Sequence, residues 1–537
     1  MLSFSREPAL SSRKRKWLLA AAIAGVAGFI SLFVIGRRMA RQFEPYIKQQ
    51  AVEYLKKRFD SEVELASLTV NVPNLSPTKL VFSRGRGVMA LVEGTGVVMR
   101  HKGRRDIPPM FAMKSFRFEV DLGRVFEPTK HVALVRLDGM EIHIPPKGER
   151  PQFKDPIGGA QPLPEVIVAD VEIHDARRVI LPRSKNRKPL EFPLHEIHLK
   201  SAGLGRPMDY TARLNIPKPP GKVESKGTFG PWDADTPGDT PAAGDYVFTE
   251  ADLGVFPAIG GTLQSSGKFE GLLSELRAKG EAKVPDFRLR RSGNRVPLQT
   301  TFEVEVDGTN GNTTLKPVRV VLGSTRFTTS GAVIKHDGDP RRTIRLRVDM
   351  ADGNLADLLR LAVPGRPMME GRLMLNANIV IPPLSGKVAE KLLLDGRFDI
   401  RDGKFRQSKI QDKLDVFSRR GQGQPKNEAI GDVASGMRGD FKLDDQVLTF
   451  SALQFVIPGA AVDLAGTYNM DADNLHFRGS VRLVAKVSQT MSGWKRIVLK
   501  PVDPFFSKNG AGTFVRIQVT GSSKDPQFGR DKQPKAR

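Results

Sequence analysis

Apolar and polar residues alternate with a period of two from Val63 onward, and this pattern recurs over most of the chain. In residues 116–122, FRFEVDL, four apolar side chains share one face and three charged side chains share the other. The pattern returns in residues 302–307, 373–381 and 475–483. Clean alternation is typical of antiparallel strands with one apolar and one solvated face. We therefore predict a mainly β protein of roughly 25 strands, given the usual strand length.

These strands predict a long apolar face, but periodicity does not fix what covers it. A β-sandwich would hide the face against a second sheet, whereas an open, curved sheet would leave a hydrophobic groove. Apolar side chains give the same pattern whether they contact acyl chains or leucine side chains. The residues that would line a groove are Phe116, Phe118, Val120, Phe302, Val304, Val306, Leu373, Leu375, Ile379, Leu475, Phe477 and Val481.

Residues 17–36, WLLAAAIAGVAGFISLFVIG, form a charge-free apolar run of 20 residues. As a helix this run would be about 30 Å long, enough to cross the hydrocarbon core of a bilayer. A cleaved signal peptide has a shorter apolar core and a small-residue cleavage site, and a buried globular helix usually has a polar stripe. The run has no such cleavage site and, apart from Ser31, no polar residue. We predict an uncleaved transmembrane helix.

The charges that flank this run leave its orientation open. Five basic residues precede the run and five lie within the 20 residues after it. The block Arg13–Lys16 directly precedes the run and favours a cytoplasmic location for residues 1–16. Long domains are translocated largely regardless of their charge, so composition alone does not decide the topology.

Helical spacing is expected in four places. Residues 37–60 carry an apolar residue at every fourth position: Phe43, Ile47, Ala51, Leu55 and Phe59. This amphipathic helix could lie on the bilayer surface or cap the first edge of the following sheet, and the strands that begin directly after it favour the cap. Short helices are predicted at 355–362, around Ile410, Leu414 and Phe417, and at 488–498.

Turn-forming residues suggest one internal boundary. Residues 231–245, PWDADTPGDTPAAGD, are rich in Pro, Gly and Asp and are predicted to be a linker loop. The linker would separate an N-terminal part of the β structure, 61–230, from a C-terminal part, 246–530. Residues 531–537 are expected to form a disordered tail.

The chain is strongly basic, with 84 Lys and Arg against 59 Asp and Glu and a net charge of +25. Such an excess fits nucleic acid, anionic lipid or a solvated basic surface. Most of the basic residues stand singly at alternate strand positions, as in residues 343–348, TIRLRV, and no nucleic-acid-binding motif accompanies them. We predict no nucleic-acid partner and a basic surface near an anionic membrane. The chain has no cysteine, which excludes disulfides and thiolate metal sites.

No sequence motif predicts catalysis. The chain lacks GxxxxGK[ST], a GxGxxG before a helix and GxSxG. His195 and His198 resemble part of a zinc motif, but residues three apart in a strand point to opposite faces. The stretches 471–474 and 233–238 resemble calcium loops without the required Gly and Glu positions, and are interpreted as turns. We predict no enzyme activity, no metal site and no cofactor.

Three stretches resemble the AsmA-like family of diderm bacteria. They are residues 252–287 (DLGVFPAIGGTLQSSGKFEGLLSELRAKGEAKVPDF), 394–404 (LDGRFDIRDGK) and 466–528, the last of which contains GTYNMDADNLHFRGSVRL, DPFF and VTGSSKDPQF. An N-terminal apolar run followed by a short helix and VELASLTV also fits the family. The resemblance covers the whole chain in layout and residues 246–530 in detail.

The resemblance implies a single-pass anchor in the bacterial inner membrane, a periplasmic body and a long antiparallel sheet curled into a hydrophobic groove. Members resemble bridge-like lipid-transfer and TamB-type envelope proteins, so membrane phospholipids are the expected partners and outer-membrane biogenesis the expected process. The family implies no catalytic residues. The alternative function is a non-enzymatic assembly factor that binds outer-membrane proteins or envelope polymers through strand edges, with other envelope proteins as partners.

Overall fold

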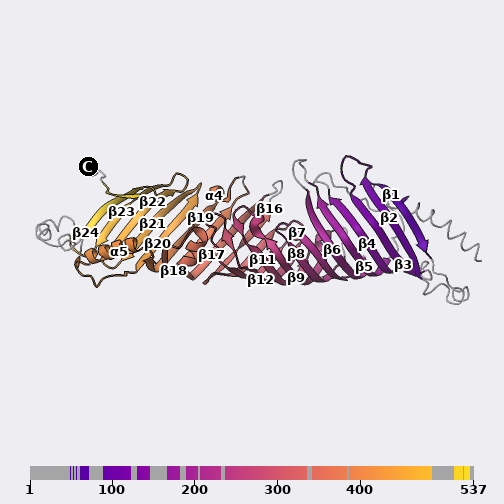
Figure 1. The fold of residues 1–537 in the computed structure, drawn as a ribbon, viewed down its shortest axis with the longest axis horizontal. Coiled ribbons are helices and arrows are strands. Elements are labelled where there is room, and N and C mark those ends of the chain that lie inside the picture. The colour runs from indigo at the N-terminus through magenta and orange to yellow at the C-terminus, as the bar shows by residue number, and fades with distance from the viewer. Residues whose placement is uncertain are drawn as a thin grey trace, which may run out of the picture. The chain divides into compact units, whose positions relative to one another are not determined.

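The computed structural model describes residues 49, 52, 53, 56, 61–71, 89–121, 130–144, 166–181, 189–203, 206–231, 236–335, 341–383, 386–486, 513–523 and 525–531. Over these residues the chain is mainly β, as the alternation predicts, and most of the strands belong to one large, predominantly antiparallel sheet (Figure 1). The chain divides into two compact units, Met1–Met208 and Asp209–Arg537.

The first unit contains six described strands in chain order. They are β1 (Ser61–Asn71), β2 (Met89–His101), β3 (Phe111–Asp121), β4 (Lys130–Ile144), β5 (Val166–Ile180) and β6 (Leu190–Gly203). Neighbours in this series pair antiparallel, except that β4 and β5 run parallel. The antiparallel prediction is therefore wrong at this one pair. A parallel pair needs a crossover connection in place of a tight hairpin turn, and the alternation within each strand carries no information about strand direction.

In the first unit, residues with irregular backbone conformation on neighbouring strands interrupt the alternation of inward- and outward-facing side chains and shift it by one position. Gly96 on β2 and Gly139 on β4 have φ values of 64° and 61°. A Cβ at Gly96 would lie 2.8 Å from the Ala66 side chain, and one at Gly139 would lie 2.8 Å from Lys114. Only glycine fits this backbone without strain. After Gly96 the buried residues of β2 are Val97 and Met99, which pack with Val63 in a small core.

The second unit contains the remaining strands, with β7 beginning at its boundary. They are β7 (Met208–Pro217), β8 (Pro220–Phe229), β9 (Pro241–Asp252), β10 (Ile259–Gly260), β11 (Thr262–Leu272), β12 (Glu275–Val284), β13 (Arg288–Leu289), β14 (Leu298–Val306), β15 (Thr313–Leu322), β16 (Thr325–Lys335), β17 (Arg342–Asn354), β18 (Met369–Ile381), β19 (Leu393–Phe405), β20 (Ser435–Asp444), β21 (Val447–Ile457), β22 (Ala460–Asn469), β23 (Asn474–Leu483), β24 (Thr513–Gly521) and β25 (Pro526–Arg530). Helical elements are η2 (Pro237–Asp239), η3 (Leu253–Val255), α3 (Leu355–Ala362), α4 (Val388–Lys391) and α5 (Ser408–Gly421).

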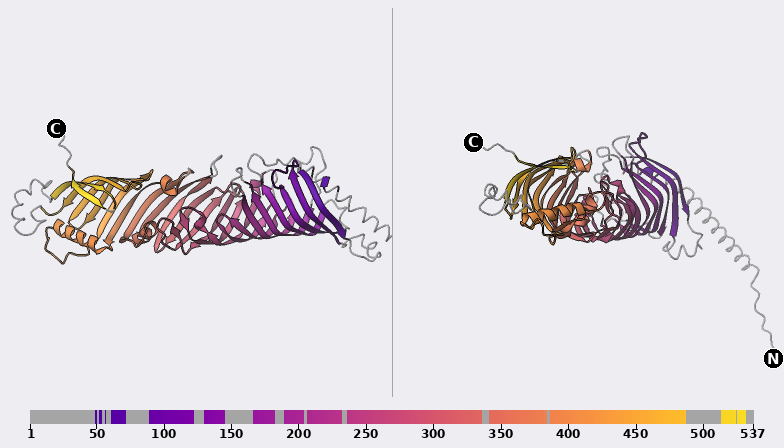
Figure 2. Two further views of the ribbon diagram at one scale, coloured as in Figure 1. Left: turned by 45° about the horizontal axis from the view of Figure 1, so that its top comes forward. Right: turned by 60° about the vertical axis from the view of Figure 1, so that its left-hand side comes forward.

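Strand pairing in the second unit follows chain order. From β8 to β25 the strands form antiparallel neighbours in chain order, which can be followed by colour in Figure 2. The exceptions are β10 and β13, which form a separate two-stranded ladder. The register places the apolar positions of neighbouring strands on one face. Gly396 of β19, for example, lies opposite Ala377 of β18 and Phe441 of β20. The alternation seen in the sequence therefore produces one apolar face across the unit.

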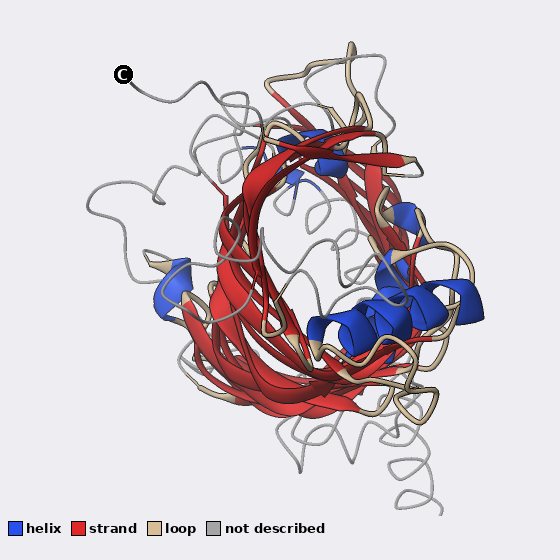
Figure 3. Ribbon diagram, turned by 90° about the vertical axis from the view of Figure 1, so that its left-hand side faces the viewer, coloured by secondary structure: helices blue, strands red, loops and turns tan. Residues whose placement is uncertain are grey.

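The predicted helices at 355–362 and around Ile410 are confirmed as α3 and α5, two of the few helices among the strands (Figure 3). Asn354 caps α3, because its side chain accepts a hydrogen bond from the backbone N–H of Ala356. Helix α3 packs Leu358 and Leu359 against a core that includes Met350 and Leu373.

The linker predicted at 231–245 is wrong in its second half. Residues 241–245 begin β9, where Ala242 is buried and Gly244 lies opposite Gly227 of β8. Pairing and burial at these positions override the turn propensity of the Pro-Gly-Asp composition.

Several expected segments lie outside the described residues. These are the apolar run 17–36, most of the amphipathic stretch 37–60, the helix predicted at 488–498 and most of the tail 531–537. Among the helices that the structure describes, none is both long enough and apolar enough to cross a membrane.

Candidate functional site on the apolar face of the sheet

The twelve predicted groove residues fall on four strands, three residues to each. Phe116, Phe118 and Val120 belong to β3 in the first unit, and the other nine belong to β14, β18 and β23 in the second. Alternation and register place those nine on the shared apolar face. Leu373 and Phe477 are buried, the other described side chains are half-buried, and the side chain of Val120 lies outside the described part.

No large second sheet covers this face within the described residues. The only other sheet found there is the ladder of β10 and β13, which have two residues each. A sandwich core would bury most inward-facing residues between two sheets, whereas most of the predicted residues are half-buried. The described part of the chain therefore favours an uncovered apolar face over a sandwich.

A row of phenylalanines crosses strands β19 to β23. The ring centroid of Phe398 lies 6.2 Å from that of Phe441 and 6.3 Å from that of Phe450, and Phe450 lies 6.0 Å from Phe477. The contacts Phe398–Phe450 and Phe450–Phe477 each skip one strand. These separations are typical of favourable aromatic pairs. The sequence interpretation selected only Phe477 from this row.

Each skipped strand has a glycine directly opposite at least one of these rings. Gly439 separates Phe398 from Leu453, and Gly466 separates Phe450 from Phe477. A Cβ at Gly439 would lie 3.2 Å from the Phe398 ring and 2.8 Å from the carbonyl oxygen of Ala452. Aromatic rings that cover strand glycines shield the exposed backbone. In the sequence, Gly439 and Gly466 each stand two residues before an aromatic residue, and this Gly-x-apolar pattern was the signal that could have located the row.

The cavities of the second unit lie mainly on the opposite, polar side of the sheet. One hollow of about 660 Å³ has Asp399, Arg438 and Asp463 among its lining residues. Arg482 pairs with Asp463 at 2.7 Å. Burial raises the pKa of Asp463, but hydrogen bonds from Gln454 and Arg482 outweigh it and lower the pKa. This side of the sheet is therefore a surface of paired charges.

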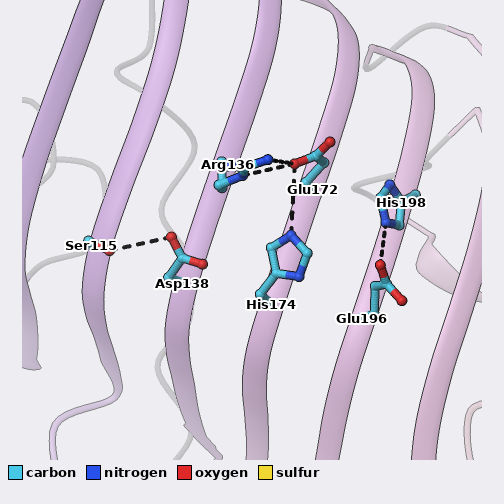
Figure 4. Close-up of polar contacts among 7 residues, drawn as sticks. All are labelled: Ser115, Arg136, Asp138, Glu172, His174, Glu196 and His198. Atoms are coloured by element: carbon cyan, nitrogen blue, oxygen red, sulfur yellow. Dashed lines mark hydrogen bonds and ion pairs between the residues drawn. The ribbon is translucent and has the colours of Figure 1, made fainter.

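The polar side of the first unit carries a similar ladder of charged groups (Figure 4). Arg136 donates to Glu172 at 2.5 Å, and the His174 ring lies 3.8 Å from the same carboxylate. His198 lies 2.8 Å from Glu196. These pairs join neighbouring strands or residues two apart on one strand, as expected for side chains that share a face.

The described residues contain no group of three or more His, Asp or Glu side chains arranged to hold a metal ion. His198 is engaged with Glu196, and His195 is not part of this contact. At the other suspected site, Asn469 accepts hydrogen bonds from the backbone of Asp471 and Ala472. This stretch is the ordinary turn that its sequence predicts.

Acid should weaken the first unit through Glu172. The hydrogen bond from Arg136 holds the pKa of Glu172 below its ordinary value of 4.5. A lowered folded-state pKa stabilises the fold above the ordinary pKa, and this contribution is lost as the pH falls through the folded value. In the unchanged chain, hydrogen-exchange protection of β4 and β5 should fall as the pH is lowered. In Glu172→Gln, which has no carboxylate to protonate at this position, we expect a smaller fall.

Exchange rates corrected for their intrinsic pH dependence would measure this effect. Glu64→Gln, which changes an exposed carboxylate on β1, is the matched control. An unchanged acid response in Glu172→Gln would contradict the role given to the Arg136–Glu172 pair.

Comparison of the chain with protein-family models, with curated proteins and with solved structures found no match. The similarity to the AsmA-like family stays a prediction from the sequence.

Proposed function

We propose that the chain is a membrane-anchored, non-enzymatic protein that binds or transfers phospholipid on the apolar face of its sheet, in support of outer-membrane biogenesis. The observation that carries the proposal is an apolar face that no large second sheet covers in the described residues. Acyl chains would remove this face from water, and the gain would be about 25 cal/mol for each Å² of apolar area buried.

The phenylalanine row gives the proposed lipid path a continuous surface. Rings that meet across strands present a carbon surface, and at Gly439 the Phe398 ring lies close to the glycine of a skipped strand. Such a surface tolerates chains of different length and position, which suits transfer better than a single enclosed pocket. We propose that the sheet curves around this surface to form a groove.

The proposed location is the inner membrane, with residues 17–36 as a single-pass anchor and the β body in the periplasm. This part of the proposal depends on the apolar run and on the family resemblance. A reporter that is active only in the periplasm, fused after Arg537, should be active. Activity of a cytoplasmic reporter at the same point would reverse the orientation.

The proposed function is tested by looking for lipid on the purified chain. The full chain, purified in mild detergent, is extracted and its lipids are measured by mass spectrometry. Because the chain has no cysteine, a photoreactive probe can be attached to a single introduced cysteine at Phe118 or Phe302. We expect bound phospholipid and lipid crosslinks at both positions, and the absence of both would reject the proposal.

Strand-edge binding is the second candidate function. Within the described residues β25 pairs only with β24, and Phe528 on β25 is 74% exposed. An open edge can accept a strand from another protein through backbone hydrogen bonds. This function would survive charges placed on the apolar face, which distinguishes it from lipid binding.

A further inference from the structure

The most buried face of helix α5 is held by polar contacts. Its buried residues include Gln411, Asp415 and Ser418, which are 7%, 8% and 0% exposed. These positions lie four and three residues apart and therefore share one face of the helix. This pattern is the reverse of an ordinary amphipathic helix, in which the apolar face is the buried one.

Each of these side chains bonds the backbone at the strand ends. Gln411 accepts from the N–H of Phe405 at 3.0 Å, and its amide donates to the carbonyl of Val433 at 3.0 Å. Asp415 accepts from the N–H of Asp432 and from that of Val433. Ser418 donates to the carbonyl of Pro458 at 2.7 Å. The contacts run from the end of β19 to the turn between β21 and β22.

The apolar stripe of α5 takes no part in these hydrogen bonds. Ile410, Leu414 and Phe417 share a different face, about 100° around the helix from the buried polar residues. They are half-buried. The apolar surface has an exposed neighbour near the C-terminal end of α5: Val484 is 74% exposed, and the N–H of the next residue, Ala485, donates to the carbonyl of Gly421.

Two cations border this stripe. Lys413 and Arg420 are exposed and seven residues apart, so they lie on one side of the helix next to Phe417. Within the described residues neither has a carboxylate at ion-pairing distance, whereas many strand cations do, such as Arg372 with Asp352 at 2.9 Å. A stripe of apolar side chains beside cations without anionic partners complements the surface of an anionic bilayer, where acyl chains and phosphates lie next to each other.

We propose that α5 docks on the surface of an anionic phospholipid bilayer. Ile410, Leu414 and Phe417 enter the boundary between headgroups and acyl chains, and Lys413 and Arg420 contact phosphates. The polar face of α5 keeps the helix attached to the sheet during docking, since none of its hydrogen bonds uses the stripe. Lipid transfer is not required for this docking.

The test uses the full chain in zwitterionic nanodiscs, with an environment-sensitive fluorophore on Leu414→Cys. Vesicles of phosphatidylcholine with added phosphatidylglycerol should shift the emission to the blue, and vesicles of phosphatidylcholine alone should have a much smaller effect. The same label on Asp412→Cys, which replaces an exposed residue on another face of α5, should not respond. Lys413→Gln with Arg420→Gln should weaken vesicle binding by roughly 10- to 30-fold, given the usual contribution of each cation at an anionic surface.

The matched control neutralises two other exposed cations, Lys226→Gln with Arg366→Gln, and should leave binding nearly unchanged. Three results would overturn the proposal. The first is no response at Leu414→Cys to anionic vesicles. The second is an equal response at Asp412→Cys, which would indicate nonspecific adsorption. The third is an emission that is already blue before vesicles are added, which would mean that protein covers the stripe.

Discussion

A triple variant of the full chain, Phe302→Glu, Ile379→Glu and Val481→Glu, is expected to bind about ten-fold less phospholipid than the unchanged chain. The reason is that burying an unpaired carboxylate under an acyl chain is unfavourable. These residues lie on β14, β18 and β23 of the second unit, one to a strand. All three are half-buried, so the carboxylates can stay hydrated on an uncovered face and the fold should persist. Lipid extraction with mass spectrometry measures the loss.

The matched control places glutamates on the same strands but on the opposite face. Thr301→Glu, Met374→Glu and His476→Glu replace exposed residues and should retain lipid. Hydrogen exchange of β14, β18 and β23 would verify that both triple variants keep the sheet. Full lipid loading of a folded variant with three apolar-face glutamates would contradict the proposed function and would favour the strand edge.

Asp415→Ala should detach helix α5 locally. The Asp415 carboxylate accepts three hydrogen bonds: from the backbone of Asp432 at 3.0 Å, from the backbone of Val433 at 3.1 Å and from the Gln411 amide at 2.9 Å. Removal of a buried acceptor leaves its donors unsatisfied, which costs about 3 kcal/mol for such a set. We expect the protection of the Val433 amide against hydrogen exchange to fall by roughly 100-fold.

Asp412→Ala gives the comparison for this variant. Asp412 lies on the same helix and is exposed, so its removal should change protection by less than about 0.5 kcal/mol. Protection of Val433 that is equal in the two variants would mean that the apolar stripe, and not Asp415, holds α5. That result would also count against the proposed docking to a bilayer, which requires that the stripe does not hold α5 to the sheet.

Local periodicity predicted much of the fold because the alternation within a single strand shows which of its residues share a face. The alternation at 373–381 becomes β18, and the helical spacing at 355–362 becomes α3. Strand direction has no such local signal, so the parallel pairing of β4 with β5 was not predicted. The shift of alternation at Gly96 also depends on neighbours, since the glycine is required by the nearby Ala66 side chain.

Helix α5 illustrates a different limit of sequence interpretation. The spacing of Ile410, Leu414 and Phe417 correctly predicts a helix, but the rule that apolar faces are buried misses the face of the helix that is most buried. The structure buries Gln411 and Asp415, whose partners are backbone groups in distant segments. Hydrogen bonds of this kind join residues that the sequence does not connect, and only three-dimensional structure reveals them.

Neighbour-only pairing has a consequence for how such a chain can evolve. From β15 to β24 each strand of the second unit pairs only with the strand before it and the strand after it, and β25 pairs only with β24, among the described residues. A hairpin could therefore be duplicated or deleted without breaking pairings elsewhere, and each such event would change the width of the sheet by about 9.6 Å. The width of the sheet can thus change in discrete steps of two strands.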